Sequence, residues 1–356
     1  MFSSKNLYKY YSHFASTSII MYTIMLTIRL VQLVIEGQTP SAKLYRCFTI
    51  NIVIYMMTAN LIIFRRYGLP DLISQVMKDE EAALNSLDKD IRKTYLAQTK
   101  IYEFTSVAQV VSTFASGLMF IALNVYMKVK GLLKHEAFMY ELWFPFNREN
   151  HDGFVIFFNL YIVVLIMFCN VASRIIPQTM IIYANAQLRV LQILLEKAFD
   201  APCSDPLVKI QELVKKHQDL INFITFLNSA LRNVIFMEYI INAINVAAGL
   251  LQFITVRAAM DLVYAFVHFS LLVIQIFVLA LNANNVSTQS EAIANAAYNS
   301  QWMDQSNNIK KIIYIMIMRA QKPLVLNIGA FGVMNAESAL TTMKAAYTYV
   351  SIGLQR

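Results

Sequence analysis

The stretch PLVLNIGAFGVMNAESALTTMKAAYTYVSIGLQR, residues 323–356, is long enough to span a membrane but carries many polar side chains. A helix of about 20 residues crosses the roughly 30 Å hydrocarbon core of a bilayer. Polar groups at that depth face a bundle interior or a water-filled path, because hydrocarbon offers them no hydrogen-bond partners. Two interpretations stay open on this physics alone. The helix either lines a pore or packs inside a monomeric bundle, with its Ser, Thr and Asn bonding to neighbouring helices.

One face of this stretch is a stripe of small or polar residues at helical spacing, with a single apolar residue near the end. Glu337 and Lys344 lie about two turns apart, so both side chains can point to the same face. They either bias the passage of ions or pair with neighbouring side chains. The stripe consists of Thr341, Ala345, Thr348, Ile352 and Gln355.

The whole chain has the composition of an integral membrane protein. Of its 356 residues, 57% are hydrophobic and 15% are charged, whereas soluble globular proteins have about 25% charged residues. The net charge of +8 suits cytoplasmic loops that face an anionic leaflet, and the basic residues do not cluster as in a nucleic-acid-binding patch. The three cysteines are isolated, which argues against a disulfide framework or a metal site.

The hydropathy pattern predicts an all-α protein with seven transmembrane helices. The first four lie within residues 1–175, and the fifth and sixth lie within 234–282. Residues 176–233 are predicted to form a cytoplasmic loop of two helices, broken at 201–206, and residues 283–322 a further amphipathic helix. Their apolar faces need partners, either within the subunit or in an anchor shared between subunits. The spans lie near residues 15–36, 47–64, 104–127, 154–175, 234–256, 259–282 and 324–352.

The distribution of positive charge predicts the orientation in the membrane. If the N-terminus is cytoplasmic, the inner side holds 20 Lys and Arg residues and the outer side holds 8. Positive charge concentrates on the cytoplasmic side of membrane proteins. We therefore expect a cytoplasmic N-terminus and an extracellular C-terminus, the reverse of a G-protein-coupled receptor. The single N-x-[ST] sequence, at Asn285, is then cytoplasmic and unglycosylated.

The sequence carries no motif for enzymatic chemistry. It lacks a Gly-rich phosphate loop, paired Cys and His at metal-ligand spacing, a G-x-S-x-G elbow and an H-E-x-x-H helix. We therefore expect neither enzymatic activity nor a cofactor. The third span has no acidic-Arg-aromatic triplet and the last has no N-P-x-x-Y, which disfavours a class A G-protein-coupled receptor. No repeat between halves supports a secondary transporter.

Two segments near the C-terminus together resemble the C-terminal signature of insect odorant receptors. The first is residues 290–302, and the second is the run RAQKPL at 319–324. The resemblance implies a subunit of seven helices. Four such subunits surround a cation pore, which is lined by the last helix of each. It also implies binding of a small volatile odorant inside each subunit, assembly with the family's shared co-receptor, and a place in the plasma membrane of olfactory dendrites. The matching positions of the first segment are Ser290, Ile293, Ala296, Tyr298 and Trp302.

A ligand pocket is expected where the outer halves of the second, third, fourth and sixth spans meet. Such a lining suits a small, mostly apolar, uncharged molecule, bound by shape and dispersion and oriented by hydroxyl groups. Gly117 is expected to leave room for ligand beside the backbone. The alternative is that all of these residues are ordinary bundle core. The candidate lining residues are Tyr55, Met56, Phe114, Gly117, Leu118, Ile121, Phe157, Tyr161, Met260, Tyr264 and His268.

The resemblance also locates a candidate gate. Tyr349 matches the near-terminal tyrosine of the family, which places Ile352 at an apolar constriction and Gln355 just outside it. A ring of apolar side chains closes a narrow pore by dewetting. Two other functions remain open: a seven-helix receptor that signals through a cytoplasmic transducer without a pore of its own, and a homomeric channel like a gustatory receptor.

Overall fold

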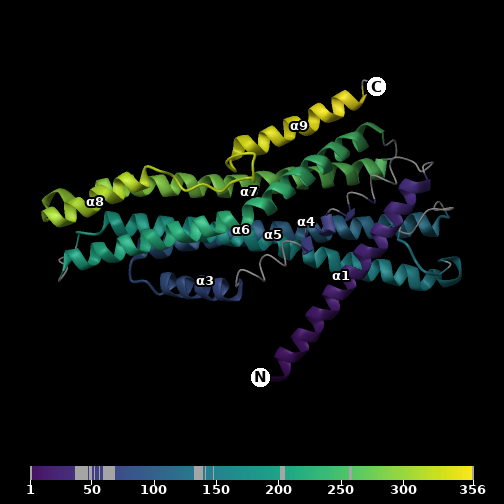
Figure 1. Cartoon of the computed structure of the whole chain (residues 1–356), viewed down its shortest axis with the longest axis horizontal. Helices are drawn as coiled ribbons and strands as arrows, with labels where there is room; N and C mark the ends of the chain where they lie inside the picture. Colours follow the sequence, from purple (N-terminus) through teal and green to yellow (C-terminus); the bar gives the residue numbers. More distant parts are fainter. Residues whose placement is uncertain are drawn as a thin grey trace. The chain divides into compact units, whose positions relative to one another are not determined.

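The computed structural model describes residues 2–36, 69–131, 139–140, 142–146, 148–200, 205–255 and 259–354, and positions 47, 50–51, 53–55 and 57–58. Within these residues the regular elements are helices, and the one β bridge is an isolated pair between Asn327 and Val333. The helices are α1 (Phe2–Glu36), α3 (Leu69–Leu84), α4 (Lys89–Val129), α5 (Asp152–Glu196), α6 (Pro206–Thr255), α7 (Ala259–Asn299), α8 (Asn307–Ala320) and α9 (Ala336–Leu354), with short 3-10 turns η1 (Arg148–His151) and η2 (Trp302–Asp304) (Figure 1).

Several helices have the length and composition of membrane spans. In the described part of the chain these are His13–Glu36, Lys89–Val129, Asp152–Glu196, Pro206–Ala247 and Phe269–Asn299. Each of them overlaps one of the spans expected from hydropathy, although Pro206–Ala247 shares only residues 234–247 with the expected span 234–256, and Phe269–Asn299 shares only 269–282 with the expected span 259–282. The expected second span, 47–64, falls largely outside the described residues, although the positions described within it are helical.

The chain divides into two compact units. Unit 1 comprises residues 1–61, 109–174 and 248–271, and unit 2 comprises 62–108, 175–247 and 272–356. All the candidate ligand-binding residues belong to unit 1, and all the candidate pore residues belong to unit 2.

The core of unit 1 is built where α1 packs against α5. Tyr22, Leu26 and Ile162 are almost completely buried in it. The segment 142–146 also packs there: the backbone N–H of Trp143 donates to the carbonyl oxygen of Met25 at 3.3 Å, and the ring of Phe144 lies 6.1 Å from that of Phe158. Burial of these apolar side chains stabilises the unit, since each buried methylene contributes about 0.8 kcal/mol.

The core of unit 2 is formed by the long helices that continue past the expected spans. Helix α5 runs on to Glu196 and α6 begins at Pro206, so the segment 176–233 is helical on both sides of the expected break. In the part of α5 that belongs to unit 2, Met180, Leu188, Leu191 and Leu195 point inward. Fully buried side chains of this unit include Ile181, Leu188, Leu191, Leu195, Ile210 and Ile224.

Two amide pairs fix the register of α5 against α7. The amide of Asn185 donates to the carbonyl oxygen of Asn282 at 2.9 Å, and Gln192 Nε2 donates to the carbonyl oxygen of Gln289 at 2.8 Å. In both pairs the acceptor lies 97 residues after the donor in the sequence. The two helices therefore run parallel in a single register. Buried amides of this kind favour one register, because sliding one helix along the other would leave them unpaired.

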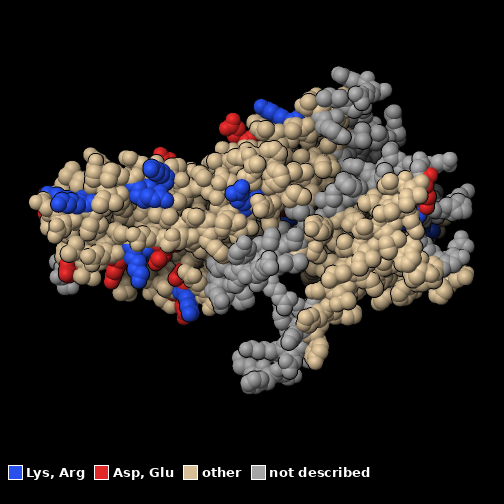
Figure 2. Space-filling view, in the orientation of Figure 1, with Lys and Arg blue, Asp and Glu red and all other residues tan. Residues whose placement is uncertain are grey.

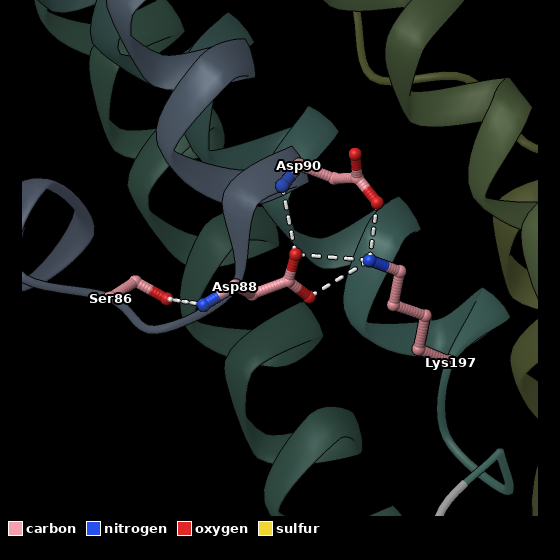
Figure 3. Close-up of polar contacts among 4 residues, drawn as sticks. All are labelled: Ser86, Asp88, Asp90 and Lys197. Carbon is pink, nitrogen blue, oxygen red and sulfur yellow. Dashed lines mark hydrogen bonds and ion pairs between the residues drawn. The ribbon is translucent and has the colours of Figure 1, made fainter.

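A charged cluster joins the turn between α3 and α4 to the end of α5 (Figure 3). Lys197 Nζ donates to both carboxylate oxygens of Asp88 at 3.0 Å and to Asp90. Asp88 also caps α4, since its Oδ1 accepts the backbone N–H of Asp90 at 2.9 Å. The hydrogen bond from Lys197 holds the pKa of the Asp88 carboxyl below its ordinary value.

The surface of unit 2 carries most of the charge that the view shows. In Figure 2 the charged side chains gather mainly over the region that α3, α6 and α8 occupy in Figure 1.

The terminal helix starts later than hydropathy predicts. The expected span 324–352 contains a non-helical connector, residues 323–335, and α9 begins at Ala336. Asn335 caps it, because Asn335 Oδ1 accepts the N–H of Ser338 at 2.8 Å while Ser338 Oγ accepts the N–H of Asn335 at 3.0 Å. The expected helix at 283–322 also differs, because η2 interrupts it between α7 and α8.

Candidate ligand pocket and pore helix

The candidate ligand-binding residues do not all lie in one place in the structure. Phe114 and Ile121 of α4 pack in one apolar cluster with Met139, Val163 and Met167. Tyr161 of α5 belongs to the cluster around Tyr22 and Leu26. The side chains of Met56, Met260, Tyr264 and His268 lie outside the described residues.

The remaining candidates face away from this interior. The exposed fractions of Tyr55, Leu118 and Phe157 are 66%, 59% and 70%. Leu118 points outward because one residue of an α-helix turns the side chain by about 100° from its neighbour Gly117. These three residues therefore do not line the core of unit 1 as it is described, and they suit contact with lipid or with another protein surface.

The space beside Gly117 is filled by protein, contrary to the expectation of room for a ligand. A Cβ atom built at Gly117 would lie 2.5 Å from Met167 Sδ and 2.6 Å from its Cε. Glycine therefore permits a close approach of α4 and α5. The thioether that occupies the space is flexible, which is the property of methionine that lets a cavity change shape.

A substitution at this contact gives a direct test of the packing. Gly117→Ala is expected to lower the free energy of unfolding by no more than about 1 kcal/mol, because the new methyl group displaces only the flexible end of the Met167 side chain. Adding Met167→Ala to the same chain should recover part of that loss. Thermal unfolding of purified protein measures both. Gly153→Ala is the control, since nothing lies within 4 Å of a Cβ there; equal melting temperatures for the two alanine variants would contradict the contact.

Two polar residues that the sequence reasoning missed lie inside unit 1. Tyr22 is 0% exposed and Asn159 is 1% exposed, and neither Tyr22 OH nor Asn159 Oδ1 has a hydrogen-bond partner among the described residues. Buried polar atoms are usually paired, because an unpaired one costs about 1–3 kcal/mol. Asn159 could have been identified from the sequence, because it is an amide side chain within an otherwise apolar span. Tyr22 was overlooked because the first span was not expected to face the pocket.

The ring of Tyr140 connects the two apolar clusters of unit 1. It packs against both clusters, 6.4 Å from the ring of Tyr22 and 5.3 Å from that of Phe120. The result is an aromatic interior with a few polar atoms, which is the composition typical of small-molecule sites.

Helix α9 has two distinct faces. Ala339, Ala346 and Val350 are buried at 0%, 3% and 8% exposure, and their spacing places them on one side of the helix. The described members of the predicted pore stripe, Thr341, Ala345 and Thr348, are exposed, as are Glu337 and Lys344. The side chains of Tyr349, Ile352 and Gln355 lie outside the described residues.

Metal-binding chemistry is not indicated in the part of the chain that the structure describes, where no three His, Cys, Asp or Glu side chains group around a common point. Among the described residues, the buried polar side chains of unit 1 are neutral hydroxyls and amides, and α9 carries such groups beside Glu337 and Lys344. They suit contact with a neutral ligand or with hydrated ions rather than catalysis.

Solved structures of another protein share this fold. The insect olfactory receptor OR5 from Machilis hrabei superimposes with a TM-score of 0.79 at 16% identity, over 97% of this chain and 88% of that chain. The same receptor in complex with eugenol gives a TM-score of 0.80, also at 16% identity, over 98% of this chain and 90% of that chain.

Curated relatives are similar over part of their length. Odorant receptor 10 of Aedes albopictus is 27% identical over 145 residues, which is 41% of this chain and 39% of that protein. Odorant receptor Or2 of Anopheles gambiae is 25% identical over 144 residues, 40% of this chain and 38% of that protein. The chain thus matches about two fifths of each relative.

A family model covers far more of the sequence. The model described as 7tm Odorant receptor matches residues 40–347. This range includes α3 to α8, most of α9 and the expected second span. With its all-α architecture and long apolar helices, the chain belongs to the seven-transmembrane odorant receptor family of insects.

Proposed function

We propose that the chain is a subunit of an odorant-gated, non-selective cation channel. A small volatile molecule binds inside unit 1, and the exposed stripe of α9 lines the pore. The observation that carries the proposal is the two-faced character of α9: one side is buried against its own subunit, while Thr341, Ala345 and Thr348 stand exposed on the other. A helix of small and polar residues in a membrane protein needs water or another subunit on that side.

The proposed ligand is uncharged, mostly apolar and equipped with one polar group. The aromatic interior around Tyr140 supplies dispersion contacts. The hydroxyl of Tyr22 supplies a donor, and the side-chain oxygen Oδ1 of Asn159 supplies an acceptor. Neither atom has a hydrogen-bond partner among the described residues. The solved complex of OR5 with eugenol supports a ligand of this size for a protein of this fold.

Assembly with other subunits is supported by α8. Its buried side packs within unit 2 through residues such as Ile309 and Ile313, whereas Tyr314, Ile315 and Met318 are 57%, 61% and 44% exposed. Apolar side chains exposed on the cytoplasmic side lack a lipid environment, so they favour contact with another chain. We propose a heterotetramer with the co-receptor in the plasma membrane of the olfactory dendrite, with the N-terminus inside and the C-terminus outside.

Current recording tests this function. Cells that express the chain with the co-receptor, and whose G proteins are blocked, should show cation current within milliseconds of odorant application. A current that disappears when G proteins are blocked would support the receptor without its own pore and would contradict the proposal. Expression of the chain alone distinguishes the homomeric, gustatory-receptor-like alternative, in which odorant evokes the same current without the co-receptor.

A further inference from the structure

The connector before α9, residues 323–335, is firmly packed although it is not helical. Leu324, Leu326 and Ile328 are 8%, 1% and 1% exposed, and Met334 is 0% exposed. Alternate residues point inward, which is the pattern of an extended chain lying on an apolar surface. The N–H of Met334 donates to the carbonyl oxygen of Leu326 at 2.8 Å, so the connector folds back on itself before the helix starts.

One face of α6 holds this connector. The backbone N–H of Asn327 donates to Asn228 Oδ1 at 2.8 Å, and that of Gly329 donates to the carbonyl oxygen of Arg232 at 3.0 Å. The ring of Phe331 lies 5.0 Å from that of Phe236. Asn228, Arg232 and Phe236 are spaced by four residues, so they form a single stripe along α6.

Helix α7 adds a further contact from another direction. The backbone N–H of Leu324 donates to Ser290 Oγ at 2.8 Å, and Ser290 is 2% exposed. Ser290 is also the first residue of the sequence signature at 290–302. The connector is therefore bonded to both α6 and α7 before α9 begins.

Gly329 fits the contact with α6 in a way that other residues cannot. Its φ angle is +51°, a conformation that side chains disfavour, and a Cβ atom built there would lie 2.7 Å from Phe236 Cβ. Both the turn and the close approach to α6 require a glycine. The geometry is specific to this position, because nothing lies within 4 Å of a Cβ built at Gly332, where φ is +103°.

We propose that the connector is a fixed clamp that holds the base of α9 on α6, so that gating moves α9 beyond its first turn while its base stays in place. The inference rests on the proposed function, since it assigns a role within a channel whose pore α9 lines. Helix α6 runs on into residues 248–255 of unit 1. The clamp thereby joins the base of the pore helix to a helix that continues into the unit of the candidate pocket, and Asn228, Ser290 and Gly329 are its positioning residues.

The first test weakens one bond of the clamp and then restores it. Asn228→Ala removes the acceptor for the Asn327 N–H. When the base of α9 is held less firmly on α6, ligand binding displaces the rest of α9 less. The odorant concentration for half-maximal current should therefore rise by about fivefold, the factor that corresponds to losing one hydrogen bond. Asn228→Asp keeps an acceptor oxygen and should give a wild-type value. An unchanged or lower concentration in Asn228→Ala, at equal surface amount, would overturn the proposal.

The second test closes the clamp covalently and applies even where Asn228→Ala fails to reach the surface. In the double variant Phe236→Cys, Phe331→Cys, which keeps Gly329, the two thiols replace rings whose centroids lie 5.0 Å apart, so an oxidant can join them across the clamp. A fixed clamp predicts that cross-linking by an added oxidant leaves odorant-evoked current intact. Loss of current on oxidation, reversed by a reductant, would show that the clamp must open and would overturn the proposal.

The two hypotheses fail in different ways. If cells that express the wild-type chain with the co-receptor, and whose G proteins are blocked, show no odorant-evoked current, the proposed function fails. If wild-type current is present but either clamp test gives the contrary result, the channel stands and the clamp alone is wrong.

Discussion

Replacing Ile352 with serine should raise the basal cation current by about tenfold, a change that corresponds to about 1.4 kcal/mol in the closing equilibrium. Ile352 lies within α9, seven residues after the exposed Ala345, and so continues the stripe of Thr341 and Thr348. A narrow apolar neck excludes water and therefore ions, whereas serine hydroxyls hold water in it. The change should appear in current recorded before odorant is added, normalised to the amount of protein at the surface.

The control for this variant lies on the other side of the same helix. Ala346 is 3% exposed and belongs to the buried face of α9. Ala346→Ser should alter surface amount or assembly rather than basal current. If Ile352→Ser reached the surface with basal current and ion selectivity unchanged, Ile352 would not be the gate and the register of the pore stripe would be wrong.

A second large effect is expected in the core of unit 2. Leu191→Ala should lower the free energy of unfolding by about 2–5 kcal/mol, because Leu191 is 0% exposed and its removal leaves a cavity. Its neighbours on the buried stripe of α5, Leu188 and Leu195, are equally enclosed. Thermal unfolding of the purified protein measures the loss, and the amount of protein at the cell surface should fall with it.

The matched control is two residues away on the exposed side of α5. Arg189→Ala should change stability by no more than about 0.5 kcal/mol, since the side chain is exposed. Equal melting temperatures for Leu191→Ala and Arg189→Ala would show that the α5 stripe is not a structural core.

The family could be recognised from the sequence because its signature is local. The segment 290–302 and the run at 319–324 pointed to insect odorant receptors, and the family match over residues 40–347 confirms this. The family also confirms the expectation of a receptor rather than an enzyme. Hydropathy identifies long apolar helices because the bilayer imposes a minimum length and an apolar composition on each span.

The start of α9 escaped prediction because averaged hydropathy does not register backbone conformation. Residues 324–335 are largely apolar, so they extended the expected span. The alternation of Leu324, Leu326 and Ile328 and the glycines at 329 and 332 argue against a helix, and in the structure both glycines have a positive φ angle. The cap formed by Asn335 and Ser338 then sets the first helical residue.

The pocket lining was harder to predict, because it depends on which helices meet and how closely. From the sequence, Gly117 was expected to leave room for a ligand. In the structure this space is filled by Met167, which comes from another helix. Leu118 of α4 and Phe157 of α5 are exposed, since their side chains lie on the outward faces of these helices. Contacts between distant residues cannot be inferred from the periodicity of a single segment.

Charge placed on the predicted pore stripe tests the central claim most directly. Thr348→Cys would be expressed with the co-receptor and treated with a positively charged thiol reagent while single channels are recorded in the presence of odorant. If α9 lines the pore, the added charge should lower the unitary cation conductance, and a reductant should restore it. An unchanged unitary conductance, with modification of Thr348→Cys verified chemically, would contradict a pore lined by this face of α9.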